Sequence, residues 1–178
     1  MTPSPDRGRL PPAPAIILVG HGRAPSDCPP ALIAELRRLK TAARLPDDPE
    51  LLAAESRIRH WPRTTRTDPY QAGLEEIAAA LRAQLAGHRI ATAYNEFCAP
   101  SLAEAIDEAA AAGCRSITVL TVMLTRGGSH SEEDIPREVA QAGRRHPGVE
   151  VRYAWPYAPA SVAGLLATQA QKGARPAI

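Results

Sequence analysis

Two long apolar runs dominate the hydrophobic pattern of the chain, and a glycine turn with a histidine follows each of them. Residues 15–19 (Ala-Ile-Ile-Leu-Val) lead through a glycine to His21, and residues 117–124 lead through two glycines to His130. Continuous apolar runs of this kind are typical of strands that are buried on both faces of a parallel sheet. We therefore predict two central parallel strands, each with a histidine just beyond its carboxyl end.

Shorter apolar segments predict two further strands, at about residues 89–94 and 149–155. Between the strands, apolar side chains recur at helical spacing, and aspartate–proline pairs mark the starts of two helices. The predicted helices cover residues 32–39, 49–59, 69–86, 102–112, 131–146 and 161–171.

Strands that alternate with helices predict an α/β fold, in which helices flank a four-stranded parallel sheet with right-handed crossovers. We expect the strand order 2-1-3-4, so that the first and third strands lie side by side. Ligands of open α/β sheets bind where the outgoing connections of neighbouring strands diverge. His21 and His130 should therefore face each other across one crevice. Imidazoles more than about 10 Å apart would contradict this order, because one metal ion needs both nitrogens about 2 Å away.

The length of 178 residues fits one domain, at residues 15–171, with a helical insertion at about residues 31–70. The proline-rich residues 1–14 are expected to be disordered, and residues 172–178 to form a polar tail. The first residues lack the apolar segment of a secretory signal.

Charge and cysteine content narrow the possible partners. A formal net charge of +2 and the lack of a long basic run argue against nucleic acid. No stretch approaches the roughly 20 apolar residues that cross a bilayer, so no membrane partner is expected. Cys28, Cys98 and Cys114 are odd in number and form no Cys-x-x-Cys pair. They favour a reduced, cytoplasmic setting, in which we expect them to be small buried side chains.

Four short motifs follow one another along the chain. They are Ile16-x-Leu18-Val19-Gly20-His21-Gly22, Glu96-x-x-x-Pro100-Ser101-Leu102, Leu124-x-x-Gly127-Gly128-x-His130 and Asp134-Ile135-Pro136. In this order they resemble the sirohydrochlorin chelatases of the CbiX and SirB type, over residues 15–22 and 89–166. Each motif alone is a weak signal, whereas the ordered series is specific.

The resemblance implies an enzyme that inserts a divalent metal into sirohydrochlorin or a related tetrapyrrole, on the way to cobalamin, siroheme or a nickel cofactor. The metal (cobalt, iron or nickel) is then a substrate, and no organic cofactor is expected. Short members of this family are homodimers in which each chain corresponds to half of a longer two-domain chelatase. A homodimer is therefore implied here as well.

The chemistry of metal insertion suits the two histidines. Imidazole is a good ligand for iron, cobalt and nickel, and its neutral ring nitrogen also accepts protons. We predict His21 and His130 as metal ligands, either of which can act as the base. Glu96, just past the second predicted strand, is a third candidate, as a carboxylate ligand or proton acceptor. Its alternative roles are to cap the helix that begins near Ser101 or to pair with an arginine.

Candidate substrate contacts flank the histidines. Sirohydrochlorin carries several carboxylates, which arginine pairs in a bidentate manner. Arg23 and Arg126 are the best-placed cations, and Gly127, Gly128 and Ser129 are further candidate contacts, or serve only the geometry of the turn.

Two alternatives stay open at this point. The segment 59–66 mixes arginines with Trp61 and is either a lid over the flat macrocycle or a linker with Trp61 packed in a groove. The protein is either a chelatase or a non-catalytic tetrapyrrole- or metal-binding protein. Arg23 favours the non-catalytic binding protein, because members of the family that the chain resembles usually have a small residue at this position. A cation there would repel a divalent ion. An unrelated hydrolase is disfavoured, since neither a Gly-x-Ser-x-Gly elbow nor a P-loop is present.

Overall fold

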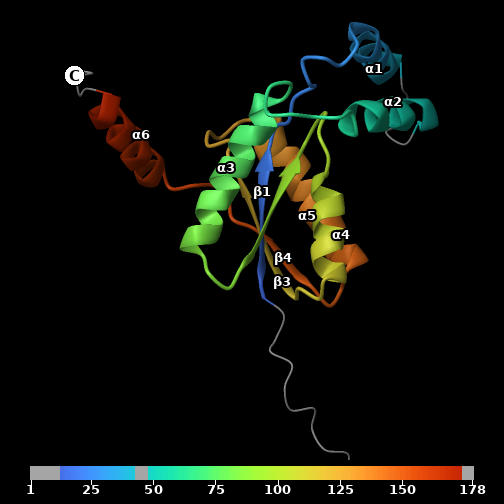
Figure 1. The fold of residues 1–178 in the computed structure, drawn as a ribbon. Coiled ribbons are helices and arrows are strands. Elements are labelled where there is room, and N and C mark those ends of the chain that lie inside the picture. Colours follow the sequence, from blue (N-terminus) through green and yellow to red (C-terminus); the bar gives the residue numbers. More distant parts are fainter. Residues whose placement is uncertain (1–12, 43–47, 174–178) are drawn as a thin grey trace, which may run out of the picture.

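Four parallel strands form the centre of the structure, a computed structural model that describes residues 13–42 and 48–173. The strands are β1 (Ala15–Gly20), β2 (Arg89–Tyr94), β3 (Ser116–Thr121) and β4 (Glu150–Tyr153). Their order in the sheet is β2-β1-β3-β4, and every pairing is parallel (Figure 1). The predicted fold class and strand order are therefore confirmed.

Helices cover both faces of the sheet. In chain order, the helices of the described residues are α1 (Pro30–Ala42), α2 (Pro49–Arg59), α3 (Pro69–Gln84), α4 (Leu102–Ala111), α5 (Ile135–Arg145) and α6 (Pro159–Gly173). On one face α4 packs against β1 and β2, and α5 packs against β4. On the other face α3 packs against β2 (Figure 1). Successive residues of a strand point to opposite faces, so β1 contributes Ile17 and Val19 to the first core and Ile16 and Leu18 to the second.

The register aligns the carboxyl ends of β2, β1 and β3. Val19 of β1 pairs with Ala93 of β2 on one side and with Thr121 of β3 on the other. All six residues of β1 are buried, which explains why its sequence shows no polar alternation. The loops that follow β1, β2 and β3 therefore leave the sheet side by side at the same edge.

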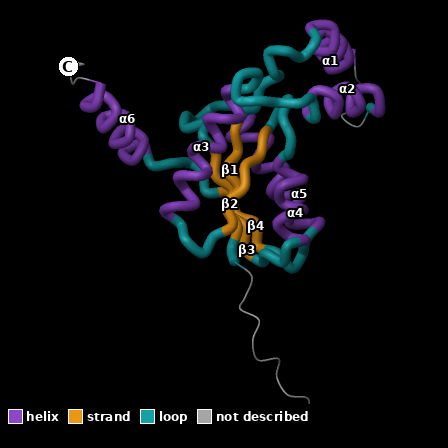
Figure 2. Tube along the Cα trace, in the orientation of Figure 1, coloured by secondary structure: helices purple, strands orange, loops and turns teal. Residues whose placement is uncertain are grey.

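The predicted insertion forms a small core of its own near this edge. Figure 2 shows α1 and α2 beyond the carboxyl ends of the strands. The two helices pack against each other around Leu36, Leu39 and Ile58. Trp61 is partly buried against the same cluster. Of the two roles considered for the segment 59–66, the structure supports the linker with a packed indole rather than the lid.

The third and fourth strands are shorter than the segments predicted for them. The apolar run continues to Leu124, but β3 ends at Thr121. Its neighbour β1 ends at Gly20, so β1 offers the residues beyond Thr121 no further strand to pair with. The next residues stay partly buried against the two cores, so burial rather than pairing explains their apolar character. The strand predicted at residues 149–155 is shorter in the structure, where β4 spans Glu150–Tyr153.

The ends of the chain differ slightly from the prediction. α6 extends to Gly173 and so includes the first two residues of the predicted tail. The predictions for residues 1–12 and 174–178 lie outside the described residues. All three cysteines are buried and free, as expected. Across residues 13–42 and 48–173, no helix combines the length and apolar character that a membrane span requires.

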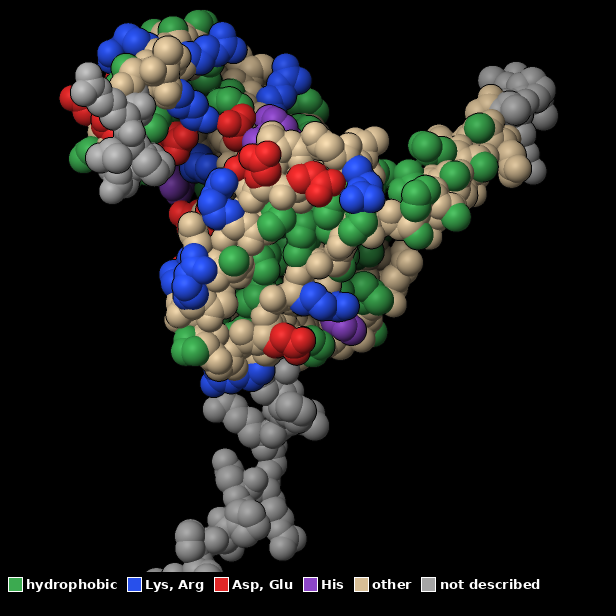
Figure 3. Space-filling view, turned by 180° about the vertical axis from the view of Figure 1, so that it is seen from behind, with side chains coloured by type: hydrophobic (Ala, Val, Ile, Leu, Met, Phe, Trp, Pro, Cys, Tyr) green, Lys and Arg blue, Asp and Glu red, His purple; other side chains and the backbone are tan. Residues whose placement is uncertain are grey.

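The last helix stands apart from the sheet. None of the residues of α6 is buried, and Leu165 and Leu166 are each 61% exposed. Figure 3 shows this helix projecting from a body that carries an apolar surface beside it. On the face that α3 covers only in part, Leu120 and Val122 remain partly exposed. An apolar helix and an apolar stretch of sheet therefore both lie uncovered in the described part of the chain.

Candidate metal and tetrapyrrole site

The carboxyl end of β1 places His21 at the edge of the sheet. Its backbone amide donates a hydrogen bond to the hydroxyl of Tyr70 in α3, at 2.7 Å. Its Nδ1 lies 2.9 Å from the carbonyl oxygen of Gly22. Because a carbonyl oxygen only accepts hydrogen bonds, this contact requires a proton on Nδ1, and in the neutral ring Nε2 then has the lone pair that can bind a metal or a proton.

The loop after β2 brings Glu96 beside His21. Beyond the paired strands, the amide of Asn95 donates to the carbonyl of Gly20 (3.1 Å), and the amide of Glu96 donates to the carbonyl of His21 (2.8 Å). The approach depends on Gly22, whose φ is +88° and where an added β-carbon would lie 1.9 Å from the carbonyl oxygen of Glu96. Only glycine combines this backbone conformation with enough room for the neighbouring loop.

His130 comes from the connection after β3 and begins a single π-helical turn, η1 (His130–Asp134), that continues into α5. Its Nδ1 lies 2.7 Å from a carboxylate oxygen of Asp134. Burial works to raise the pKa of Asp134, but hydrogen bonds from Arg137 and His130 outweigh it and hold this pKa below its ordinary value. The ionised carboxylate accepts a hydrogen bond from Nδ1–H, which leaves Nε2 of His130 as the ligand atom.

Three side chains from three loops converge at this edge. The imidazole rings of His21 and His130 meet edge to face, with centroids 4.7 Å apart and planes at 81°. One ligand atom from each of His21, Glu96 and His130 lies within 4.8 Å of the other two. Nitrogen and oxygen ligands bind a divalent ion at about 2 Å, so two ligands of one ion lie up to about 4 Å apart. The three ligand atoms therefore lie close to the separations that one shared ion requires.

Glu96 has a partner that the sequence did not suggest. The ammonium Nζ of Lys40, in α1, lies 2.9 Å from Oε1 of Glu96. Burial works to raise the pKa of Glu96, but the hydrogen bond and the charge of Lys40 outweigh it, so this pKa lies below its ordinary value. Glu96 does not cap α4, because Ser101 and Glu104 form that cap together.

A cavity of about 280 Å³ opens beside Glu96 and His130. Its cations are Arg59, at the end of α2, and Arg137, in α5, whereas Arg23 and Arg126 lie on the exposed surface outside its lining. The guanidinium of Arg59 donates to the carbonyls of the loop after β2, and that of Arg137 pairs with Asp134, yet the Arg137 side chain remains 55% exposed.

Gly127, Gly128 and Ser129 form the exposed turn that leads into His130. The amide of Gly127 donates to a carboxylate oxygen of Glu132 (3.2 Å), and the carbonyl of Gly128 accepts from the amide of Glu132 (3.0 Å). These bonds serve the geometry of the turn, and the described residues place none of the three in the cavity lining. Their role as substrate contacts stays a prediction.

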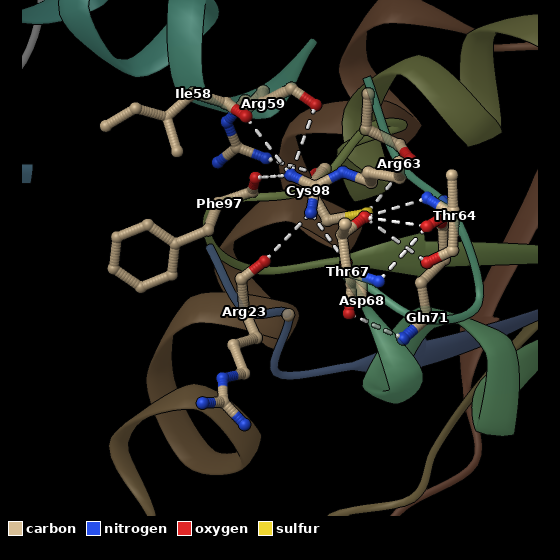
Figure 4. Close-up of polar contacts among 12 residues, drawn as sticks. Arg23, Ile58, Arg59, Arg63, Thr64, Thr67, Asp68, Gln71, Phe97 and Cys98 are labelled. Carbon is tan, nitrogen blue, oxygen red and sulfur yellow. Dashed lines mark hydrogen bonds and ion pairs between the residues drawn. The ribbon is translucent and has the colours of Figure 1, made fainter. Parts of the chain in front are cut away.

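A buried arginine ties the loops of the site together (Figure 4). Arg63 pairs with Asp68 at 2.6 Å, and the two side chains are only 7% and 1% exposed. Its guanidinium also donates to backbone carbonyls of three separate segments, at Arg23, Ile58 and Phe97. Phe97 has a φ of +59°, a strained conformation for a residue with a side chain. Arg63 thus helps to fix the loop that carries Glu96.

The chain matches a known protein family. The sequence model of the CbiX family matches residues 63–171, which is more than half of the chain. The chain belongs to the CbiX family. Glu96 and His130 lie within the matched residues of this CbiX chain, whereas His21 and Lys40 precede them.

Solved structures share the fold of the CbiX chain. The sirohydrochlorin chelatase SirB from Bacillus subtilis subspecies spizizenii, crystallised in complex with cobalt, is 18% identical with a TM-score of 0.50; the alignment covers 81% of this chain and 43% of SirB. A CbiX protein from Marinobacter aquaeolei VT8 is 21% identical with a TM-score of 0.53, over 89% of this chain and 92% of that protein. The chain thus spans less than half the length of SirB. No curated protein is similar to it in sequence.

Sequence reasoning missed the two residues whose side chains pair with Glu96 and His130. Asp134 follows His130 by four residues within a helical segment, a spacing that places two side chains together and that could have identified the pair. Lys40 belongs to the insertion, and nothing in the sequence connects it with Glu96. Its position follows only from the packing of α1 and α2 at the carboxyl edge of the sheet.

Proposed function

We propose that the protein is a chelatase that inserts a divalent metal ion into sirohydrochlorin or a related tetrapyrrole. The observation that carries the proposal is the convergence of His21, Glu96 and His130 within 4.8 Å, in a chain of the CbiX family. Two imidazoles and one carboxylate form a donor set that suits cobalt, iron and nickel alike. The metal is the substrate of this reaction.

Insertion requires an ion that is held but not enclosed. Three protein ligands leave coordination positions open for the ring nitrogens of the tetrapyrrole. Thiolates would hold these metals more firmly, and the cysteines of the chain are buried. As the metal binds, the macrocycle loses its two pyrrole N–H protons, so the products are the metallated ring and two protons. A neutral Nε2 of His21 or His130, or the carboxylate of Glu96, accepts them.

The carboxylates of the tetrapyrrole need cationic partners near the ion. Arg137 lines the cavity beside His130 and keeps part of its guanidinium exposed, which supports it as one such partner. Arg23 and Arg126, which the sequence indicated, remain candidates for carboxylates that extend beyond the cavity. Bidentate pairing of a guanidinium with a carboxylate would orient the ring as well as bind it.

Direct assay tests this function. Purified protein is mixed anaerobically with sirohydrochlorin and Co²⁺, Ni²⁺ or Fe²⁺, and the visible spectrum is followed over time. We expect metallation faster than the protein-free rate with at least one metal. Binding of metal and ring without acceleration would instead identify a non-catalytic binding protein, and absence of both would contradict the proposal.

We further propose that two copies of the chain associate through α6. Its exposed leucines and the partly exposed Leu120 and Val122 of the sheet are both apolar and both uncovered. The hydroxyl of Tyr157 bonds to the backbone amide and carbonyl of Thr121, at 3.1 and 2.7 Å, and so fixes the chain just before α6 where it leads away from its own sheet. Reciprocal packing of α6 on the sheet of a second copy would cover both surfaces.

Light scattering and cross-linking test the homodimer. The wild-type chain is expected to be dimeric, and the double variant Leu165→Asp/Leu166→Asp monomeric, whereas Gln171→Asp on the opposite side of α6 should stay dimeric. In a mixture of Leu120→Cys and Leu166→Cys chains, oxidation is expected to join two different copies. A monomeric wild-type chain would contradict this association.

A further inference from the structure

The ammonium of Lys40 directly contacts Glu96, one of the three proposed metal ligands. Nζ of Lys40 lies 2.9 Å from Oε1 of Glu96 and 3.4 Å from Oε1 of Glu55, in α2. It also lies 5.7 Å from the centre of the Phe97 ring, which adds a cation–π contact. Glu96 and Phe97 lie within the residues that match the CbiX family, whereas Lys40 and Glu55 belong to the part of the insertion that precedes residue 63. The ammonium beside Glu96 is therefore contributed from outside the matched segment.

The environment makes this charge effective at short range. The side chain of Lys40 is 38% exposed, and those of Glu55 and Glu96 are each 27% exposed. Partly buried charges within a few ångströms of each other are screened much less by salt than separated surface charges. The two carboxylates and the phenyl ring hold the ammonium beside the donor set even though its own side chain is long and flexible.

An ion bound by Glu96 would lie close to this ammonium. A metal–oxygen bond of about 2 Å on Glu96, added to the contact between Glu96 and Lys40, places like charges about 5 Å apart. The ammonium also withdraws electron density from the carboxylate that it hydrogen-bonds. Both effects oppose binding of a divalent cation at His21, Glu96 and His130.

We propose that Lys40 weakens the hold of the His21–Glu96–His130 site on its divalent ion and replaces the ion on Glu96 when the metal leaves for the tetrapyrrole. The inference rests on the proposed function. A chelatase must give up its metal, and an internal cation that re-pairs with Glu96 lowers the cost of leaving that carboxylate without a counter-ion. Lys40 is thus a positioning residue that acts through Glu96.

The sign of the effect on metal affinity tests this role. Co²⁺ binding is measured by isothermal titration calorimetry at neutral pH for the wild-type chain and for Lys40→Met and Lys40→Gln. Both variants are expected to bind Co²⁺ about tenfold more tightly, which corresponds to ~1.4 kcal/mol. A merely structural role of Lys40 would give the opposite result, since a disturbed site binds metal more weakly.

Two controls separate charge from general effects. Lys40→Arg keeps the charge and should retain an affinity near that of the wild type, and Arg38→Met removes a neighbouring exposed charge of α1 and should change the affinity little. Unchanged or weaker Co²⁺ binding by both uncharged variants, with wild-type circular dichroism, would overturn the inference. Even in that case the proposed function would stand, provided that the wild-type chain binds Co²⁺ and His21→Ala does not. A wild-type chain that binds none of Co²⁺, Ni²⁺ and Fe²⁺ would remove both.

Discussion

Gly22→Ala is expected to disrupt the site and to lower the free energy of unfolding by more than about 4 kcal/mol. The added β-carbon would lie 1.9 Å from the carbonyl oxygen of Glu96, so the loops after β1 and β2 would have to separate. The φ of +88° adds backbone strain of about 1–2 kcal/mol for any residue with a side chain. Urea denaturation measures the loss of stability, and Co²⁺ titration measures the loss of the metal site.

Gly127→Ala is the matched control for this substitution. Gly127 has a similar φ of +84°, but an added β-carbon there meets no atom within 4 Å. Its effect should therefore be limited to the backbone strain, about 1–2 kcal/mol. Equal losses at the two positions would show that the close approach of Gly22 to Glu96 does not matter.

His21→Ala and His130→Ala are each expected to lower the rate of metal insertion by about 10²–10⁴, the range for removal of a positioned acid–base group. Each substitution also removes a nitrogen ligand, so Co²⁺ binding should weaken together with the rate. Both side chains lie at the solvent-facing edge of the sheet rather than in either core, so the fold should persist. The measurement is the anaerobic assay with sirohydrochlorin, with circular dichroism as the check on folding.

His88→Ala provides the comparison for these variants. His88 is an exposed residue just before β2, at the opposite end of that strand from Glu96. The His88→Ala variant should insert the metal into the ring at the wild-type rate. A wild-type rate for His21→Ala or His130→Ala would show that the residue is not part of the reaction, whatever its position.

The architecture could be predicted because local patterns and general rules of chain topology agree. Residues 15–19 are apolar without alternation, since β1 is buried on both faces, and the aspartate–proline pairs begin α2 and α3 as expected. Parallel pairing then requires crossovers, and the crossover rule leaves few strand orders. The end of β3 was less predictable, because apolar residues beyond it stay partly buried after pairing has stopped.

The candidate site was predictable only in part. A histidine after each central strand is a feature of the sequence, and the parallel order turns it into a spatial expectation. Arg23 and Arg126 were the nearest cations in sequence, but the cavity is lined by Arg59 and Arg137. Proximity along the chain is a poor guide here, because the direction of an exposed side chain depends on loops whose course the sequence does not specify.

By itself, the sequence determined the parallel α/β sheet, its strand order and the edge at which His21, Glu96 and His130 meet. These depend on burial patterns and on chirality, which are properties of short segments and their connections. The tertiary structure alone decided that Lys40 pairs with Glu96, that Arg63 joins three loops and that α6 stands uncovered. Such contacts arise between segments far apart in the chain, and their energies depend on distances of a few ångströms that no local pattern encodes.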